Sequence, residues 1–292
     1  ITLRQHAIGV NFLDTFFRSG AFPLPAYPAP IGLEAAGVIE AVGAGVTDFA
    51  VGDRVAYHSS FGAYAERRVL PASDLLPLPA DISFEQAASV LIKGLTAHML
   101  LTQSHVVQAG QVVLIHAMTG GVGSLLSRWA STVGATVIGT VGSAAKKDLA
   151  LHRGFEHVIN LQAEDLTQQV QAFTQGQGVD VVYDSIGEAT FSRSSALVKA
   201  GGSAVLYGWS SGMPVVDTEL LAQRRVRYVH PALNHYLTDR ERTAAALAEV
   251  FDQVRYGLLA GQEPTVYALA EAATAHADLE ARKTTGSLIL RP

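Results

Sequence analysis

Two patterns of hydrophobic and polar positions follow each other along the chain. In the first ninety residues, short apolar or alternating runs are separated by glycine, proline and aspartate, which is typical of short β-strands joined by turns. These runs predict strands at 1–10, 36–43, 52–57 and 63–70. Prolines at 23, 25, 28 and 30 predict an extended loop, because proline fixes φ and cannot donate to a central sheet. The first part of the chain is therefore predicted to be an irregular β-barrel with long loops.

The pattern changes near Ser83, which has the spacing of a capping box with Gln86 and so predicts the start of a helix. Beyond it, short apolar runs alternate with stretches of helical periodicity. Strands are predicted at 112–116, 136–141, 158–160, 179–184 and 203–208, and helices at 123–133, 146–153, 166–174 and 192–198. Strands that alternate with helices of this length predict a parallel, doubly wound sheet in an α/β fold.

The C-terminal part returns to a mixed pattern. Thr238 and Glu241 have capping-box spacing, which predicts a helix that runs to about Tyr256 and ends at Gly257. Strands are predicted at 265–268 and 287–290, with a helix at 270–282 between them. The simplest architecture is a β-rich domain built from both ends of the chain, residues 1–92 and 231–292. A doubly wound domain, residues 93–230, is inserted between them.

Composition narrows the class of protein. With 292 residues, 49% of them hydrophobic and 16% charged, the chain can bury a large core, so a disordered scaffold is excluded. The net charge of -5 and the lack of any basic run argue against nucleic-acid binding. Cysteine is absent, which rules out disulfides and thiolate metal sites.

No apolar stretch of about twenty residues predicts a membrane span. The chain begins at Ile1 rather than Met, and its first ten residues already have the pattern of a strand. We therefore expect an N-terminal segment to be missing. Any targeting peptide would be lost with that segment. A cytoplasmic location is expected because the sequence predicts no membrane span and has no cysteines that would indicate an oxidising compartment.

The strongest chemical signal is a glycine cluster between a buried strand and a helix, in the run VVLIHAMTGGVG at 112–123. Such glycines let the backbone turn tightly and let a pyrophosphate approach the free N–H groups of a helix N-terminus. Ala117 replaces the first glycine of the common fingerprint. An ordinary glycine-rich turn is the alternative, but the strand before, the helix after and the next strand favour a dinucleotide site. Its predicted ligands are the backbone amides of Thr119, Gly120, Gly121 and Val122.

The end of the next strand indicates which dinucleotide is bound. Sites for NAD place an acid about twenty residues beyond the glycines, but here the stretch GTVGS at 139–143 has none. Gly142 and Ser143 end it, and Lys146 follows, so that a hydroxyl and a cation are available for a 2′-phosphate. This favours NADPH. A solvated lysine on a helix face is the alternative interpretation of Lys146.

The motifs together resemble the medium-chain dehydrogenase/reductase superfamily, and within it the zinc-free, ζ-crystallin-like quinone oxidoreductases. The resemblance covers essentially the whole chain. The motifs that carry it are NFLDTFFRSG at 11–20, GLEAAG at 32–37, GDRV at 52–55, KGLT at 93–96, the glycine turn at 117–123, DSIG at 184–187 and AH at 275–276. The resemblance implies a GroES-like catalytic domain, an inserted Rossmann domain, NADPH as cofactor and a homodimer. The dimer would pair through the edge strands of the Rossmann sheets, for which residues 226–229 are the candidate.

A catalytic zinc is not expected. Zinc-dependent members of the superfamily have a histidine where this chain has Leu33, and they need cysteines that this chain lacks. The histidine pairs 152/157 and 230/235 have no third ligand nearby in the sequence, and they are interpreted as surface or loop residues. Without a Lewis acid, catalysis would depend on positioning and on donors near the oxygen that gains charge.

The resemblance also implies roles for residues outside the glycine turn. Asn11 and Asp14 would lie near the nicotinamide and are the candidate catalytic residues, although an Asn/Asp pair at this spacing is also typical of a turn or helix cap. Lys93 and Thr96 would approach the cofactor. Further contacts would come from Tyr207, Gly208, Trp209 and Ser210 on the nicotinamide side, and from Arg282 on the adenosine phosphate.

Four positions depart from the branch. Leu33 replaces a threonine, Phe16 a tyrosine and His230 an arginine, and all three changes make the substrate pocket less polar. Leu161 stands where a tyrosine often packs by the 2′-phosphate.

The glycine turn, the strand end and the resemblance together predict hydride transfer from NADPH to a small electrophile, with a quinone as the leading acceptor. A reductase of activated C=C bonds in 2-alkenals or enones, or a weakly catalytic NADPH-binding protein, are the alternatives.

Overall fold

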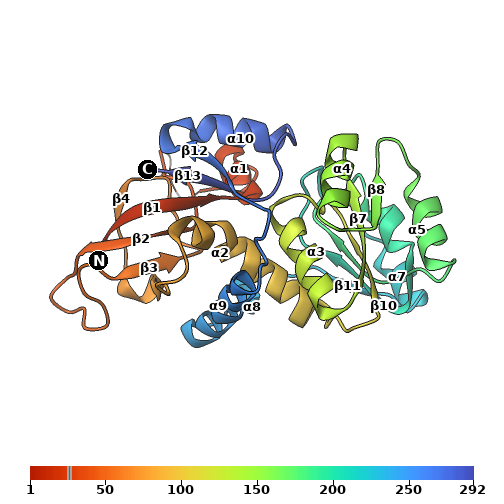
Figure 1. Cartoon of the computed structure of the whole chain (residues 1–292), viewed down its shortest axis with the longest axis horizontal. Coiled ribbons are helices and arrows are strands. Elements are labelled where there is room, and N and C mark those ends of the chain that lie inside the picture. The colour runs from red at the N-terminus through yellow and green to blue at the C-terminus, as the bar shows by residue number, and fades with distance from the viewer. Residues whose placement is uncertain (25, 27) are drawn as a thin grey trace. The chain divides into compact units, whose positions relative to one another are not determined.

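The computed structural model describes residues 1–24, 26 and 28–292, and it divides the chain into two compact units. Unit 1 consists of Ile1–Leu95 and Asp239–Pro292, and unit 2 of Thr96–Thr238 (Figure 1). The domain borders predicted from the sequence, at 92/93 and 230/231, stay a prediction. Of the four prolines in the predicted loop, Pro25 lies outside the described residues.

Unit 1 is built on a sheet of seven strands within the described residues, which are β1 (Thr2–Val10), β2 (Ala35–Ala41), β3 (Arg54–Tyr57), β4 (Arg67–Val69), β5 (Leu76–Pro77), β12 (Thr265–Ala268) and β13 (Leu288–Arg291). Their order is β12-β13-β1-β2-β3-β5, and β4 pairs with β1. The first and last parts of the chain thus share one sheet, as predicted. The core under it holds Leu3, Ile8, Ile39, Tyr57 and Leu290, all at most 1% exposed.

One predicted strand of unit 1 is shorter than expected. The run at 63–70 forms a strand only over Arg67–Val69. The carbonyl groups of Ala63 and Ala65 instead accept hydrogen bonds from the side-chain amide of Gln5, which lies on β1. A side chain therefore replaces the backbone ladder over these residues.

The helices of unit 1 are α1 (Phe12–Ser19), α9 (Arg240–Arg255), α10 (Ala272–Glu280) and the first part of α2 (Phe84–Met99), with short 3-10 turns η1 (Ala72–Asp74) and η3 (Leu269–Glu271). The capping box of Ser83 and Gln86 is confirmed, since each side chain bonds the other's backbone N–H, at 3.0 and 2.8 Å. The cap predicted at Thr238 is wrong by one residue. Asp239 caps α9, because its carboxylate accepts the backbone N–H of Arg242 at 2.8 Å.

Unit 2 contains a parallel sheet of six strands, which are β6 (Val112–Ile115), β7 (Thr136–Val141), β8 (His157–Asn160), β9 (Val179–Asp184), β10 (Val198–Leu206) and β11 (Arg227–Val229). The order β11-β10-β9-β6-β7-β8 is that of a doubly wound nucleotide-binding fold, so the predicted fold class is confirmed. The remaining helical segments are the π-helical turn η2 (Leu100–Ser104), α3 (Gly121–Val133), α4 (Ala144–His152), α5 (Leu166–Thr174), α6 (Phe191–Ser195), α7 (Thr218–Gln223) and α8 (Leu233–Tyr236).

The helix predicted at 192–198 ends too late. Helix α6 stops at Ser195, and Val198 already pairs with Val179 as the first residue of β10. The register then shifts to Ser203 opposite Val181. Gly202 permits this shift, because a Cβ there would lie 2.4 Å from the Asp180 carbonyl oxygen. Pairing with the neighbouring strand therefore overrides the local helical pattern.

The strand predicted at residues 226–229 is the edge strand β11, which pairs with β10. In the part of the chain that the structure describes, no helix has both the length and the apolar character needed to cross a membrane.

Candidate active site

The glycine turn of unit 2 has the geometry of a phosphate-binding loop. It leads from β6 into α3, and Ala117 takes a left-handed conformation with φ of 50°, which an alanine rarely adopts. A Cβ at Gly123 would lie 2.2 Å from the Ala117 carbonyl oxygen, so only glycine fits there. Helix α3 begins at Gly120 without a side-chain cap and without an acidic residue in its first turn. Its N-terminal N–H groups and positive dipole end are therefore available for an anion.

The predicted pyrophosphate ligands are consecutive in this turn. Thr119 is buried at 3% exposure, whereas Gly120, Gly121 and Val122 are half-buried. The Gly120 N–H is turned back to the Ala117 carbonyl at 2.8 Å, which closes the turn. The next N–H groups, in the first turn of α3, have no carbonyl partner within the helix and can bind a ligand at its N-terminus.

A buried polar cluster lies next to the glycine turn. The His116 Nδ1 lies 2.9 Å from the Thr140 hydroxyl oxygen, and its Nε2 lies 3.6 Å from an oxygen of Asp184. These side chains end β6, β7 and β9, and none is more than 1% exposed. Burial lowers the pKa of His116, so the ring is neutral near pH 7. None of the three was among the predicted site residues.

Two further predicted segments follow strands of the same sheet. Ser143 comes after β7 and caps α4, where its hydroxyl oxygen accepts the Lys146 backbone N–H at 3.3 Å. Lys146 is half-buried, whereas the adjacent Lys147 forms an ion pair with Glu164 at 2.7 Å. Because parallel strands end at one edge of the sheet, Gly142 and Ser143 lie on the same edge as the glycine turn.

The segment Tyr207–Ser210 follows β10 at this same edge. It is held against the end of β9, because the Tyr207 N–H donates to the Asp184 carbonyl at 2.9 Å and the Ser210 N–H to the Ser185 carbonyl at 3.1 Å. Gly208 permits the approach, since a Cβ there would lie 3.1 Å from the Ser185 carbonyl oxygen. The Trp209 ring meets His230 edge-on at 5.4 Å. The structure thus brings all the predicted unit 2 residues of the glycine turn, β7 and β10 to one edge.

Unit 1 holds a second group of predicted residues around a carboxylate that sequence reasoning missed. Glu34 is fully buried, and its Oε1 accepts the Asn11 side-chain amide at 2.7 Å and the Lys93 ammonium at 3.2 Å. Its other oxygen accepts the Ile92 backbone N–H at 2.6 Å. Gly9 makes room for it, because a Cβ there would lie 2.2 Å from Oε1. Glu34 therefore fixes both Asn11 and Lys93.

Asp14 is also fully buried, on α1. Its Oδ2 accepts the Asn11 backbone N–H at 2.8 Å and the Tyr64 hydroxyl at 3.1 Å. Burial, and to a smaller extent the charge of Glu34, raise the pKa of Asp14 to about 7. The alternative interpretation of Asn11 and Asp14 as a helix cap is correct as far as the backbone goes, since Asp14 does cap the first turn of α1.

The other two predicted residues lie apart from these groups. Thr96 is half-buried on α2, three residues beyond Lys93, and it falls in unit 2. Arg282 is exposed just beyond α10 in a left-handed conformation, with φ of 57°. Whether either contacts a cofactor stays a prediction.

The departures from the branch have defined surroundings. Leu33 is 5% exposed beside Glu34, and Phe16 packs edge-on against Phe12 and Phe22 at 5.3 and 5.4 Å. His230 is exposed, and Leu161 packs half-buried against the core of unit 2. Apolar and aromatic groups therefore flank the Asn11 end of α1.

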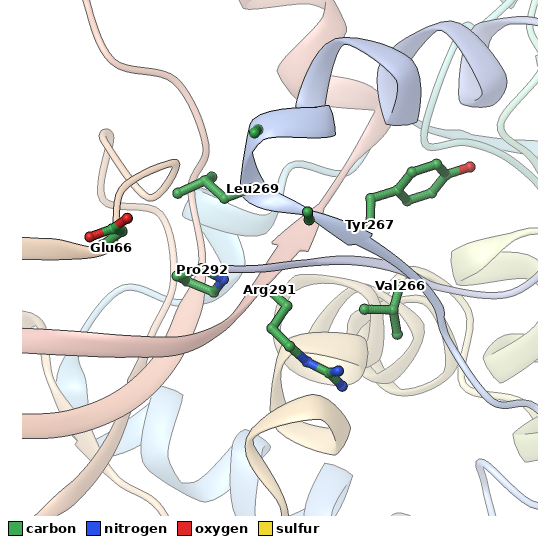
Figure 2. Close-up of a pocket in the computed structure, with 8 residues that line it drawn as sticks. Glu66, Val266, Tyr267, Leu269, Arg291 and Pro292 are labelled. Carbon is green, nitrogen blue, oxygen red and sulfur yellow. The ribbon is translucent and has the colours of Figure 1, made fainter.

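A shallow hollow of about 480 Å³ lies elsewhere in unit 1, beside the edge strand β12. Figure 2 shows the side chains that line it, among them Glu66, Val266, Tyr267 and Arg291. None of the predicted site residues lines this hollow. Among the described residues, no group of three or more His, Cys, Asp or Glu side chains is arranged to hold a metal ion.

Comparison with known proteins identifies the family. Residues 1–80 match the alcohol dehydrogenase GroES-like domain, and residues 121–251 match the family described as zinc-binding dehydrogenase. The chain is 43% identical to a quinone oxidoreductase of Pseudomonas aeruginosa, over all of this chain and 91% of that protein. It is 41% identical to a 2-haloacrylate reductase of a Burkholderia species, over all of this chain and 90% of that protein.

Solved structures agree with this result. A crystal structure of Escherichia coli quinone oxidoreductase complexed with NADPH superposes with a TM-score of 0.93 at 41% identity, and the match covers all of this chain and 91% of that one. The fold, the glycine turn and the full-length identity lead to one conclusion. The chain belongs to the quinone oxidoreductase family of the medium-chain dehydrogenase/reductase superfamily.

Proposed function

We propose that this protein is an NADPH-dependent oxidoreductase that reduces quinones by hydride transfer. The observation that carries the proposal is the phosphate-binding geometry at Gly120–Gly123, at the carboxyl edge of a doubly wound sheet. Full-length identity of 43% to a quinone oxidoreductase supports the reaction, and the NADPH complex of the Escherichia coli relative supports the cofactor.

The residues of unit 2 fit NADPH. Thr119, Gly120, Gly121 and Val122 would surround the pyrophosphate. The N–H groups of Gly121 and Val122 would bind it, whereas the Gly120 N–H closes the turn onto the Ala117 carbonyl, and the uncapped start of α3 supplies favourable charge. After β7 no acid is present to bind a ribose 2′-hydroxyl or to repel a 2′-phosphate. Gly142, Ser143 and Lys146 would hold that phosphate instead. Arg282 would contact the adenosine phosphate.

When bound, NADPH supplies a hydride from its nicotinamide ring. The segment Tyr207–Ser210 would orient this ring, because it is fastened to the end of β9 by two backbone hydrogen bonds. Asn11, Lys93 and Thr96 would complete the site. The buried Glu34 holds Asn11 and Lys93 in place, so that the Asn11 side chain needs no reorganisation during the reaction.

A second activity, reduction of activated C=C bonds, is favoured by a specific observation. The chain is 41% identical over its full length to a 2-haloacrylate reductase. The apolar replacements Leu33 and Phe16 also suit an acceptor with little polar surface. Hydride transfer to a quinone and to an enone uses the same positioned nicotinamide, so the two activities differ in how the acceptor binds.

The proposal is tested by measuring steady-state oxidation of NADPH with 1,4-benzoquinone, 9,10-phenanthrenequinone and an enone side by side. We expect the two quinones to have the larger kcat/KM. Calorimetry of NADPH and NADH binding accompanies the assay, with Gly123→Ala as the variant that blocks the phosphate turn. Binding without turnover of any acceptor would favour a weakly catalytic NADPH-binding protein. No binding of either nucleotide would contradict the proposal.

We also propose a homodimer that pairs through β11. This strand bonds to β10 on one side of the sheet and ends the strand order on the other, which leaves backbone groups available for a second copy. Light scattering after size-exclusion chromatography measures the mass directly. The cytoplasmic location stays a prediction from the sequence.

A further inference from the structure

Three side chains from distant parts of unit 1 form a continuous hydrogen-bonded path. The Tyr64 hydroxyl lies 3.1 Å from Asp14 Oδ2 and 2.8 Å from His276 Nε2. Asp14 lies on α1 and His276 on α10, which pack against each other (Figure 1). Asp14 is 0% exposed and His276 is 1% exposed. A hydroxyl between a carboxyl group and an imidazole can accept a proton from one and donate its own to the other.

The backbone is shaped to hold the middle of this path. Gly32 has φ of 89°, and a Cβ there would lie 2.2 Å from the Tyr64 ring. The Tyr64 backbone N–H also bonds to the Ile31 carbonyl at 3.0 Å, next to this glycine. Both the left-handed conformation and the steric space require glycine at position 32. The Tyr64 ring is therefore held in one position against Gly32, and from there its hydroxyl contacts both Asp14 and His276.

The charged surroundings favour a proton on Asp14. Its Oδ1 is buried and has no hydrogen-bond partner among the residues that the structure describes. Glu34 is a second buried carboxyl nearby, and the Lys93 ammonium pairs with Glu34 at 3.2 Å. Burial, and after it the charge of Glu34, raise the pKa of Asp14 to about 7, while the Asn11 N–H, Tyr64 and Lys93 act in the opposite direction. Asp14 thus holds a proton over much of the range near neutral pH.

The other end of the path approaches the surface. His276 is influenced by Arg18 on α1 and Glu280 on α10, and these two form an ion pair at 2.7 Å with about 40% of each side chain exposed. Burial lowers the pKa of His276, and Arg18 lowers it further. The lowered pKa favours the neutral ring, so a protonated His276 imidazolium readily donates its proton. Its Nδ1 has no hydrogen-bond partner among the described residues.

We propose that Asp14, Tyr64 and His276 are a proton relay that supplies the proton which accompanies hydride transfer to the acceptor. This inference rests on the proposed function. Reduction of a quinone consumes one hydride, supplied by NADPH, and one proton. The acceptor gains an O–H bond as the O–H bond at Asp14 Oδ1 breaks, directly or across one bridging water. Asp14 Oδ2 then takes the Tyr64 proton, Tyr64 takes the Nε2 proton of the His276 imidazolium, and that imidazolium has formed by uptake of a solvent proton at Nδ1.

The carboxyl group is suited to this step because it gives a proton at one oxygen and takes one at the other without rotating. Asn11 is held at its backbone by Asp14 and at its side chain by Glu34, so the donor end of the relay is fixed beside a predicted catalytic residue. With an enone, the hydride would go to the β-carbon and the same proton to the α-carbon or to the oxygen of the resulting enolate. The atom balance is unchanged.

The test compares Tyr64→Phe with the unaltered enzyme. The variant keeps the aromatic ring that packs against Gly32 and removes only the hydroxyl. We expect kcat with 1,4-benzoquinone at pH 6, where Asp14 is protonated, to fall by about 10²-fold, the lower end of what a positioned proton donor contributes. The KM and dissociation constant for NADPH should not change. The solvent deuterium isotope effect on kcat should change, because proton supply then follows another route.

The matched control is Tyr267→Phe. Tyr267 also donates its hydroxyl to an aspartate of unit 1, Asp278, at 3.0 Å, but it belongs to β12 and takes no part in the relay. Its kinetics should equal those of the unaltered enzyme. If Tyr64→Phe does not fold, His276→Ala replaces it, and added imidazole should restore kcat by filling the space of the lost ring.

The possible outcomes are distinguishable. Loss of kcat in Tyr64→Phe with restored activity of His276→Ala in imidazole supports the relay. An active enzyme whose kcat, pH profile and isotope effect are unchanged by Tyr64→Phe overturns the relay and leaves the proposed function intact. An unaltered enzyme that reduces neither quinones nor enones overturns the proposed function and, with it, the purpose of the relay.

Discussion

The buried Asp14 carboxyl makes the stability of unit 1 depend on pH, and Asp14→Asn should remove this dependence. The pKa of Asp14 is about 7 in the folded protein and 3.8 without its surroundings. Because the folded pKa is the higher one, folding binds a proton between these values. The protonated Asp14 carboxyl therefore contributes to the free energy of unfolding. This contribution is fully present below pH 3.8 and is lost as the pH rises through about 7.

The magnitude follows from the pKa difference. About three units at 1.36 kcal/mol each give a loss of about 4 kcal/mol at pH 8 relative to strongly acidic pH. Integration of the same two pKa values places about 3 kcal/mol of this loss between pH 5 and pH 8. Asparagine keeps the size of the side chain and an oxygen for the Asn11 N–H and the Tyr64 hydroxyl, but it carries no charge at any pH. The stability difference between Asp14→Asn and the unaltered protein should therefore grow in favour of the variant across this range.

The assay is urea unfolding of the cofactor-free protein at pH 5, 6, 7 and 8, followed by far-ultraviolet circular dichroism. Tryptophan fluorescence provides an internal reference, since Trp129 and Trp209 both belong to unit 2. Asp278→Asn is the control, because Asp278 also accepts a tyrosine hydroxyl, from Tyr267 at 3.0 Å, but in a contact that is only partly buried. A difference between Asp14→Asn and the unaltered protein that stays constant from pH 5 to pH 8 would refute the reasoning.

Three further predictions address the cofactor site. Gly123→Ala places a Cβ 2.2 Å from the Ala117 carbonyl oxygen and should weaken NADPH binding by at least tenfold in calorimetry, whereas Gly45→Ala, where the added Cβ meets nothing within 4 Å, should not. Lys146→Ala should raise the KM for NADPH far more than that for NADH, and equal effects on both would contradict a contact with the 2′-phosphate. Prolonged treatment with a chelator should leave kcat unchanged, because the described residues offer no group of three metal ligands, and activity that zinc restores would speak against this.

The cofactor half of the site is readable from the sequence because its parts are local. The strand, the glycines and the helix of the phosphate turn lie within residues 112–133, and each has its own sequence signal. The all-parallel strand order follows from the alternation of strands and helices. The boundaries are less local, as α6 and β10 illustrate, because pairing of Val198 with Val179 decides where the helix ends.

The acceptor half could be read only in part. Asn11 and Asp14 were assigned to the site from the resemblance. Among their partners, Glu34 and His276 belong to the motifs at 32–37 and 275–276 but were given no role, and Tyr64 was not named. The contact of Tyr64 with His276 spans 212 positions, and that of Tyr64 with Asp14 spans 50. No periodicity or spacing in the sequence reports such contacts. Gly32 offers the one local signal, since a left-handed glycine just before a buried carboxylate indicates close packing, but it does not say against which side chain.

The DSIG motif at 184–187 shapes the loop that follows β9. Asp184 is fully buried, and its carboxylate accepts the N–H groups of Ile186 and Gly187 at 2.7 and 3.0 Å and the Thr190 hydroxyl at 2.7 Å. These bonds satisfy the charge and shape the loop after β9, and the Ser185 carbonyl in that loop holds Ser210. The neutral His116, which precedes the glycine turn, lies 3.6 Å from the same carboxylate, so one buried group borders both loops. The residues of this motif therefore shape the loop that holds the predicted cofactor segment at Ser210.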